Sequence, residues 1–319
     1  MYIMFRYFSI FIILTVLGYL YEKYKLKYVP DEELDKYDMV RKFLLNGGSG
    51  LGDKPILWIH TSHPINHRYW PSFGSRNTRL LNQPYKVSCV ETVVKYCSKS
   101  FNIVLIDDYS FEKLLKGWRI DMDKLANPVK AHMRMLALSK LLHSFGGLLL
   151  PNSTIVCKDL KPLYNGGLTT SDCFSVNMIN RGNSADISTL IPTTKIMGCK
   201  KNSSIMGQFV TYLENLTSTD YTNESDFLGQ ANQWLYSNNN LNVLCGKTFG
   251  VEDNDGKQIG IDRLMGNTFI NFSPNKYAIY IPGDEILKRT KYEWFARLSQ
   301  QQLRNCDTIA AKQLLIAQG

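Results

Sequence analysis

Residues 128–163 read PVKAHMRMLALSKLLHSFGGLLLPNSTIVCKDLKPL. Apolar residues recur at helical spacing from Val129 to Phe145, so this part is predicted to form an amphipathic helix. Gly146 and Gly147 end the helix, because glycine readily adopts the backbone conformation that closes one. The apolar run Leu148 to Leu150 that follows predicts a buried strand.

Two more buried strands are predicted upstream, at Pro55 to His60 (PILWIH) and at Phe101 to Ile106 (FNIVLI). Between them, Tyr85 to Cys97 has the apolar spacing of a helix, and Phe111 to Leu115 begins a short one. The apolar positions of the first of these helices are Val87, Val90, Val94 and Cys97. The order strand, helix, strand, helix, strand predicts an α/β domain with a largely parallel central sheet.

The pattern is looser downstream. The predicted elements are helices at Ser204 to Thr217 and Leu228 to Ser237, a hairpin turn at Asp253 to Gly256, a strand at Tyr277 to Ile281, a helix from Pro282 to about Gln300, and a last helix at Thr308 to Ala317. We expect residues 53–250 to form the main domain, and residues 251–319 to pack on it as a hairpin and helices.

The amino terminus contains the longest apolar run of the chain, from Tyr2 to Tyr21, which is interrupted only by Arg6. About 20 such residues in a helix cross the bilayer core, so residues 1–21 are predicted to be a single-pass membrane anchor. A cleaved signal peptide and a buried core helix are the alternatives, although no small residues suited to a cleavage site follow the run. Lysines 23, 25 and 27 weakly favour a cytosolic body. Residues 22–52 are predicted to be a stalk and a glycine-rich linker.

The 319 residues carry a net charge of +9, and 44% of them are hydrophobic, which supports a sizeable core. No basic stripe with interleaved aromatic residues and no nucleic-acid motif is present, so a nucleic-acid partner is not expected. The seven cysteines form no Cys-x-x-Cys pair, and their spacing suggests neither zinc nor a dense disulfide framework. Glycosylation sequons occur at Asn152, Asn202, Asn215, Asn223 and Asn271, and they matter only if the domain is lumenal.

Several polar residues are candidates for a site. His60, which ends the first strand, and Asp107 with Asp108, which end the second, are candidate nucleotide-binding residues, with a solvated turn as the alternative for the aspartates. His63 and His67 extend His60 into a histidine series, but no carboxylate or cysteine lies nearby to complete a zinc site.

Two acidic pairs have simpler explanations. Asp121 and Asp123 are interpreted as helix-capping residues. Asp253 and Asp255 resemble the start of a calcium loop, but no glutamate follows at its twelfth position, so a hairpin is the preferred interpretation. No metal site is predicted.

The segment from Pro128 to Leu163 resembles the central block of DXD-type sugar-nucleotide glycosyltransferases, as in capsular polysaccharide synthesis and Golgi mannosyltransferase-like enzymes. In that family a helix leads into a Gly-Gly pair, a strand ends in Asp-x-Asp, and a Leu-x-Pro-Leu-like segment follows. The predicted strands at 56–60 and 101–108 look like the first two of that fold. The resemblance covers residues 53–180 and implies a GT-A-like (Rossmann-like) mixed sheet, with nucleotide bound at the carboxyl ends of its strands.

The chain departs from that family where the metal is bound. The two family aspartates hold Mn²⁺ or Mg²⁺, which neutralises the leaving diphosphate. The matching positions here are Pro151, Asn152 and Ser153, a degenerate DXD with no carboxylate. A second polar set, Ser-Asp and then Arg on the preceding helix, is replaced by Arg134, Met135 and Leu138. Because Gly146 and Gly147 fix the register, a misalignment does not explain both losses.

The segments at 60–70 (HTSHPINHRYW), 101–114 (FNIVLIDDYSFEKL) and 146–153 (GGLLLPNS) also look like uncharacterised transferase-like proteins of large nucleocytoplasmic DNA viruses. That resemblance implies a viral membrane or virion context, in a host endomembrane or the viral inner membrane. Other virion or membrane proteins would then be the partners.

Three functions follow as hypotheses. The first is a transferase-like pseudoenzyme with a structural or scaffolding role. The second is an active glycosyltransferase that binds a nucleotide sugar without a metal, with Lys or Arg side chains neutralising the diphosphate. The third is a carbohydrate- or partner-binding module. Mn²⁺ or Mg²⁺ would enter only if carboxylates from elsewhere, such as Asp172, Asp226 or Asp262, completed a site.

Overall fold

The computed structural model describes residues 54–61, 83–180, 190–219 and 224–319. The predicted anchor at 1–21 and the stalk at 22–52 lie outside these ranges, as do His63, His67 and Asn223. Within the ranges, no helix combines the length and the apolar character needed to cross a membrane. Residues 53–319 form one compact unit.

A six-stranded mixed sheet runs through this unit in the order β2-β1-β3-β6-β5-β7. Its strands are β1 (Ile56–His60), β2 (Asn102–Ile106), β3 (Gly147–Pro151), β5 (Cys173–Ile179), β6 (Leu190–Cys199) and β7 (Asn242–Leu244). Strand β1 pairs in parallel with β2 and with β3, and β7 runs parallel to β5. Strand β6 is antiparallel to both of its neighbours, β3 and β5. The three predicted strands and their parallel pairing are confirmed.

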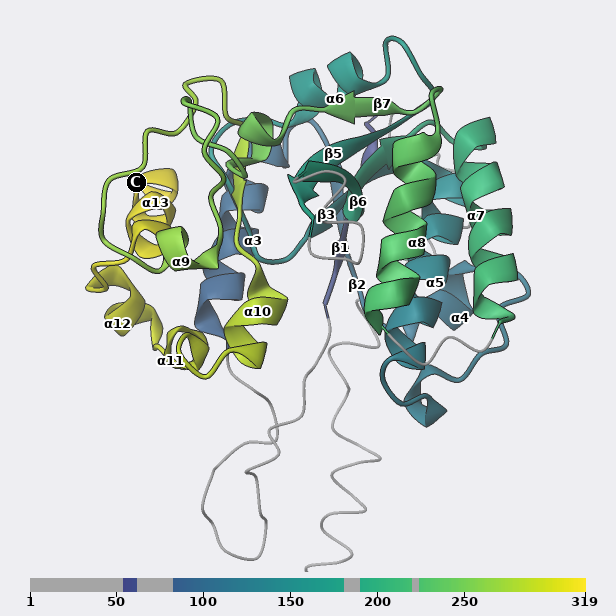
Figure 1. Cartoon of the computed structure of the whole chain (residues 1–319), viewed down its shortest axis with the longest axis horizontal. Coiled ribbons are helices and arrows are strands. Elements are labelled where there is room, and N and C mark those ends of the chain that lie inside the picture. The colour runs from purple at the N-terminus through teal and green to yellow at the C-terminus, as the bar shows by residue number, and fades with distance from the viewer. Residues whose placement is uncertain (1–53, 62–82, 181–189, 220–223) are drawn as a thin grey trace, which may run out of the picture. The chain divides into compact units, whose positions relative to one another are not determined.

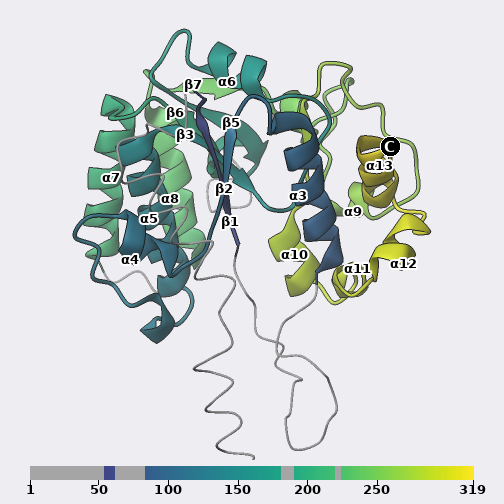
Figure 2. The same cartoon turned by 180° about the vertical axis from the view of Figure 1, so that it is seen from behind.

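Helices cover both faces of the sheet (Figures 1 and 2). On one side lie α5 (Val129–Phe145), α7 (Ser204–Thr217) and α8 (Glu224–Ser237). On the other side lie α3 (Pro84–Cys97) and the helices of the carboxyl-terminal segment. Alternation along β1 divides its side chains between these layers, because successive strand residues point to opposite faces. Trp58 contacts Phe145 of α5, whereas Leu57 and Ile59 pack in one core with Val93 of α3.

The predicted glycine pair has a clear steric role. Gly146 and Gly147 have φ angles of +70° and +107°, a region that favours glycine. A Cβ on Gly147 would lie 2.3 Å from the backbone oxygen of Ile56, so β3 can pair closely with β1 only if this position is glycine. The indole Nε1 of Trp58 donates to the carbonyl of Gly146 over 2.9 Å.

The carboxyl-terminal segment packs on α3 and on a small antiparallel sheet formed by β4 (Thr154–Val156) and β8 (Ala278–Tyr280). Its helices are α9 (Ile261–Leu264), α10 (Gly283–Lys288), α11 (Glu293–Ala296), α12 (Gln300–Arg304) and α13 (Ile309–Gln318). Their buried residues share a core with Tyr85, Cys89 and Ile155. The remaining short elements are α4 (Ser110–Leu114), η2 (Met122–Lys124), α6 (Lys161–Gly167) and η3 (Gly246–Phe249).

One predicted element differs from the structure. The single helix expected from Pro282 to about Gln300 is instead α10, α11 and α12, because the chain becomes extended at Arg289 and a Ser299–Gln302 capping box starts a new helix. The predicted hairpin turn at Asp253 to Gly256 is confirmed, because Glu252 and Gln258 on either side of it form an antiparallel bridge and the Ile259 backbone N–H donates to the carbonyl of Val251 over 2.7 Å. There the Asp253 carboxylate accepts hydrogen bonds from the Asp255 and Lys257 backbone N–H groups and pairs with Arg263.

The buried face of α3 also differs from the predicted one. Of the four apolar positions in the prediction, Cys97 is buried, but Val87 and Val94 are 55% and 48% exposed. The residues that α3 buries instead include Tyr85, Cys89 and Val93, which follow one another at intervals of four. The valine row therefore lies on a different side of the helix.

Candidate functional site

The candidate residues predicted from sequence meet at one edge of the sheet. Because β1, β2 and β3 are parallel, their carboxyl ends lie together, and His60 is in register with Ile106 on one side and with Pro151 on the other. Asp107 and Asp108 follow β2 directly. This carboxyl edge is where ligands bind in open α/β sheets.

Asp108 is the centre of a charged cluster at this edge. Its two oxygens accept two hydrogen bonds from Arg134 of α5, from Nε to Oδ1 over 2.7 Å and from Nη2 to Oδ2 over 2.6 Å. Nε2 of His60 lies 3.0 Å from the same Oδ1, and the Lys130 ammonium is 3.7 Å from Oδ2. Only 13% of the Asp108 side chain is exposed. We call these four residues the Asp108 cluster.

The cluster fixes the protonation of its members. Burial alone raises the pKa of Asp108, but the hydrogen bonds from Arg134 and His60 outweigh it and hold that pKa well below its usual range. Burial lowers the pKa of His60, and Asp108 opposes this only in part. His60 is therefore a neutral ring at neutral pH. Because the Asp108 carboxylate can only accept, Nε2 of His60 carries the proton and donates it.

Asp107 has a different environment from its neighbour. It is buried, and its Oδ1 accepts hydrogen bonds from the backbone N–H and the hydroxyl of Ser110 over 3.0 and 2.9 Å. These bonds hold the turn into α4. Phe111 of that helix stacks on the ring of His60, with centroids 5.6 Å apart, so the Asp107 turn positions the histidine. A nucleotide-binding role for Asp107 stays a prediction.

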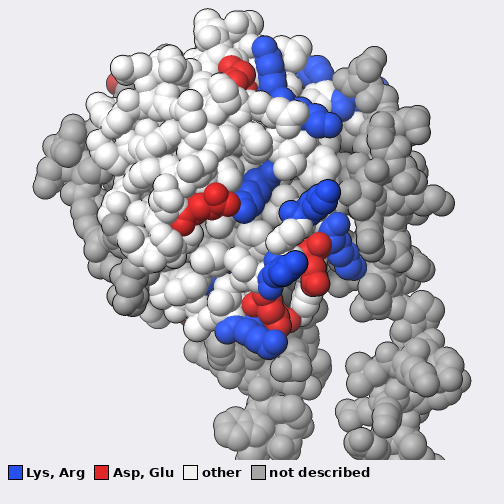
Figure 3. All heavy atoms as spheres, turned by 90° about the vertical axis from the view of Figure 1, so that its right-hand side faces the viewer, with Lys and Arg blue, Asp and Glu red and all other residues white. Residues whose placement is uncertain are grey.

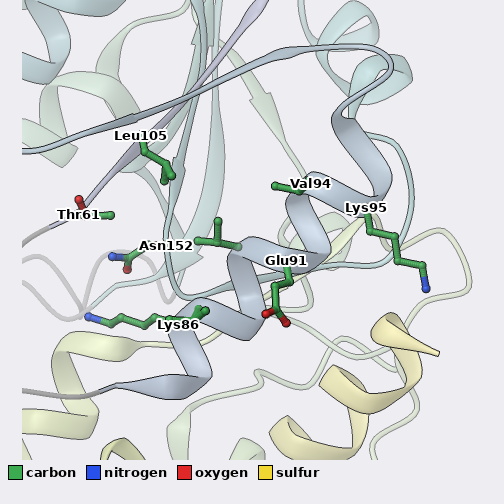
Figure 4. A pocket seen from close by; sticks show the side chains of 9 residues that line it. Thr61, Lys86, Glu91, Val94, Lys95, Leu105 and Asn152 are labelled. Carbon is green, nitrogen blue, oxygen red and sulfur yellow. The ribbon is translucent and has the colours of Figure 1, made fainter. Parts of the chain in front are cut away.

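The degenerate DXD position lies beside this cluster and offers no carboxylate. Ser153 is buried, and its hydroxyl donates to the carbonyl of Ile281 over 2.7 Å. Asn152 points to the α3 side and lines a cavity of about 580 Å³ (Figure 4). The wall combines the apolar side chains of Val87, Val94 and Leu105 with the charged Glu91 and Lys95 of α3.

Lys86 also lines this cavity and brings an ammonium group to it. It comes from the first turn of α3, and its side chain extends away from the helix alongside Asn152 (Figure 4). Burial lowers the pKa of Lys86, while the carboxylate of Asp284 opposes that shift. An apolar cavity with a few converging polar groups is the usual form of a small-molecule site.

The carboxylates considered from the rest of the chain lie elsewhere. Asp172 accepts from the backbone N–H of Ser204 over 2.8 Å and so caps α7. Asp262 pairs with Tyr292, Arg289 and Lys291 in the carboxyl-terminal helices. The side chain of Asp226 lies outside the described residues. Across the described ranges, no three His, Cys, Asp or Glu side chains converge as metal ligands.

Sequence reasoning missed four charged residues at this edge. Lys130 and Arg134, four positions apart on the predicted helix, were a detectable signal, because that spacing places both on one face. Lys195, inside an apolar strand, and Asp284, which follows β8, gave no local signal. They form an ion pair of 3.1 Å. Of the predicted glycosylation sites, Asn202, Asn215 and Asn271 are exposed, while Asn152 is partly buried.

The positive net charge is not concentrated on the face formed by α7 and α8. Neither helix contains Lys or Arg, and the Lys and Arg side chains seen from this side gather in the right half of the view, with fewer Asp and Glu among them (Figure 3). The ion pair of Lys140 with Glu214 joins α5 to α7 at 2.6 Å.

No protein-family model matches the chain, and no curated protein matches it. Among solved structures, the galactosyltransferase LgtC, in complex with donor and acceptor sugar analogs, is 9% identical with a TM-score of 0.42, covering 82% of this chain and 95% of that one. An active-site mutant of LgtC is 10% identical with a TM-score of 0.41, covering 83% and 95%. The PaToxG glycosyltransferase is 13% identical with a TM-score of 0.31, covering 66% and 79%. At these scores the likeness is loose and assigns no residue.

Proposed function

We propose that this chain is a glycosyltransferase-like protein whose carboxyl edge binds a sugar-nucleotide type of ligand without a divalent cation. The observation that carries the proposal is the state of Asp108. It is the carboxylate that ends β2, and both of its oxygens are already bound by Arg134 and His60. Since Pro151, Asn152 and Ser153 supply no carboxylate either, the edge is not suited to hold a hard cation through oxygen ligands.

The same edge is suited to an anion. Arg134 and Lys130 bring two positive charges to Asp108, Lys130 also lies 3.8 Å from the Asp123 carboxylate, and His60 is neutral. Lys86 adds a further ammonium at the cavity beside β3. Preorganised cations in a site that excludes water stabilise the negative charge of a diphosphate without a metal ion.

The cavity supports a ligand with an apolar or aromatic part. Its valine and leucine side chains form a surface on which a flat base or a sugar ring can pack, and Asn152 offers both an amide donor and an amide oxygen. A volume of about 580 Å³ lies within the range typical of small-molecule sites.

A second candidate function is a structural, non-catalytic transferase-like protein, anchored in a host endomembrane or in a virion by residues 1–21. The state of Asp108 is also compatible with this function, because a carboxylate whose pKa is held well below its usual range is a poor base. The predicted anchor and the resemblance to viral transferase-like proteins support the proposed location in a membrane or a virion.

Calorimetric titration of the full chain in detergent micelles tests the proposal. UDP-, GDP- and CMP-sugars are titrated in excess EDTA and then in Mn²⁺. We expect saturable binding of one donor in EDTA, with an affinity that Mn²⁺ does not raise. Binding only in Mn²⁺ would contradict a metal-free site. No binding under either condition, for a protein that still unfolds cooperatively, would favour the structural function.

A further inference from the structure

Strand β6 contains a bulge at the carboxyl end of β3. Ser175 of β5 is opposite Met197, but Asn177, two residues later, is opposite Pro192. The pairing thus advances five residues along β6, from Met197 to Pro192, while it advances two along β5. Hydrogen bonds hold the bulged segment, from Ser175 Oγ to the carbonyl of Thr193 over 2.7 Å and from the Lys195 backbone N–H to Thr193 Oγ1 over 3.2 Å. Bulges often re-aim a side chain next to a functional site.

The side chain that this bulge presents is Lys195. Its ammonium donates to Tyr280 Oη over 3.2 Å and to Asp284 Oδ2 over 3.1 Å. A lysine ammonium has three donors, so one is left after these two bonds. The side chain is 43% exposed, which leaves that donor open to a ligand. Partial burial lowers the pKa of Lys195, but Tyr280 and Asp284 outweigh it and raise it, so the group stays charged.

Lys195 and Asp284 lie beside the degenerate DXD. Because Leu149 of β3 is in register with Met197, the bulge begins where β3 reaches Pro151. The segment that leads to Asp284 also lies next to Ser153. The backbone N–H of Ile281, three residues before Asp284, donates to the carbonyl of Ser153 over 3.0 Å. A Cβ on Gly283 would lie 3.3 Å from the Ser153 side chain.

We propose that the Lys195 ammonium, held by Asp284 and Tyr280, takes the place of the divalent cation and binds the diphosphate of the ligand. Lys86, which lines the cavity together with Asn152, supplies a second ammonium. This inference rests on the proposed metal-free binding and names the groups responsible for it. Lys195, Lys86 and Asp284 together carry one net positive charge, while Glu91 and Lys95, which also line the cavity, offset each other. This net charge attracts a diphosphate.

The test uses inorganic pyrophosphate as the probe, because it contains the diphosphate without base or sugar. Full-length protein in detergent micelles is titrated calorimetrically in excess EDTA. Lys195→Gln is expected to weaken pyrophosphate binding by about tenfold or more, since a charge-assisted bond is lost. Lys140→Gln is the matched control. It also removes a lysine from an ion pair with a carboxylate, and it is expected to leave the affinity within about twofold, since that pair joins α5 to α7 and is not part of the proposed site.

A second variant separates ligand binding from a structural role of the ion pair. Asp284→Asn keeps an oxygen that can accept from Lys195 but removes the charge that opposes the ligand. It is expected to bind pyrophosphate as tightly as the wild type or several-fold more tightly. Opposite effects of Lys195→Gln and Asp284→Asn support the proposal. Equal losses in both variants would show that the pair only maintains the fold at this edge, and would overturn it.

The remaining outcomes distinguish this inference from the proposed function. If a nucleotide sugar binds in EDTA and Lys195→Gln binds it and pyrophosphate like the wild type, metal-free binding stands and Lys195 is not the group responsible. If the wild type binds a nucleotide sugar but no pyrophosphate, the diphosphate is not the part recognised, and the inference fails alone. If neither ligand binds, both fail.

Discussion

Arg134 binds both carboxylate oxygens of Asp108, although 26 residues separate them in sequence and they belong to different elements. The pair links the residue after β2 to α5 at the carboxyl edge of the sheet. His60 of β1 forms a further hydrogen bond with Asp108. A bidentate arginine–carboxylate pair is geometrically specific, because the two parallel hydrogen bonds fix both planes. The relative position of three elements thus depends on one carboxylate.

Removing Arg134 is expected to destabilise the fold. In Arg134→Met the Asp108 carboxylate keeps only His60 and the more distant Lys130, and a largely buried charge with reduced pairing costs about 2 kcal/mol or more. Urea unfolding of the variant measures this loss. Asp108→Asn in the same background should recover part of it, because the uncompensated charge is gone. A double variant as unstable as the sum of the two single variants would contradict coupling between these residues.

The Asp108 cluster also predicts a dependence of stability on pH. Burial lowers the pKa of His60 below 6.5, so between the two values the unfolded chain binds more protons than the folded one. The contribution of the neutral ring is complete above about pH 6.5 and is lost as the pH falls toward the folded-state pKa. Asp108, whose pKa is depressed, adds a second loss as the pH falls below about 4.

The free energy of unfolding, measured from pH 4 to pH 8, tests this for His60→Gln against the wild type. The glutamine amide can still donate to Asp108 but does not titrate. We expect the variant to be less dependent on pH than the wild type below about pH 6.5, and to follow it above that pH. Parallel curves across the whole range would show that His60 does not titrate differently on folding.

Gly147 tests the fit between β3 and β1. In Gly147→Ala the added Cβ would lie 2.3 Å from the Ile56 carbonyl oxygen, at a φ of +107° that alanine disfavours, so the strands must separate. We expect a loss of about 2 kcal/mol or more in the free energy of unfolding, measured by urea denaturation. Gly166→Ala in helix α6 has no neighbour within 4 Å of its Cβ and is expected to be neutral or stabilising. Similar losses in both would contradict a specific role for Gly147.

The sequence predicts well what depends on local pattern. The helix from Val129 to Phe145 and the strands on either side of it are found where apolar spacing and the glycine pair place them. The predicted long helix after Pro282 is wrong because its division depends on long-range packing. Tyr292 and Phe295 are buried in the carboxyl-terminal core, and the chain bends to place them there.

The charged site is less accessible to sequence reasoning, because its partners are distant along the chain. Lys195 reaches Asp284 only through the bulge opposite β5, and a register shift depends on the pairing of whole strands. The valine row of α3 shows the same limit. Val87 and Val94 have the spacing of a buried face, yet they line the cavity next to Asn152, while the Tyr85, Cys89 and Val93 side enters the core.

Restoring a carboxylate at the degenerate DXD gives the most direct test of metal-free binding. Asn152→Asp places a negative charge in the cavity that Lys86 lines. In excess EDTA we expect the variant to bind nucleotide sugars about tenfold more weakly than the wild type, because the new carboxylate repels the diphosphate and neutralises an ammonium. Calorimetry measures the change, and Asn165→Asp on the exposed part of α6 controls for the added charge.

The response of that variant to Mn²⁺ completes the experiment. A hard cation binds oxygen ligands, so Mn²⁺ should restore part of the affinity lost in Asn152→Asp while leaving the wild type unchanged. The difference arises because the wild-type edge neutralises its ligand with fixed ammonium groups, and the variant has gained a carboxylate that offsets one of those charges and can bind a metal ion. If Asn152→Asp binds the donor in EDTA as tightly as the wild type does, Asn152 and Lys86 lie outside the ligand site, and the cavity has another use.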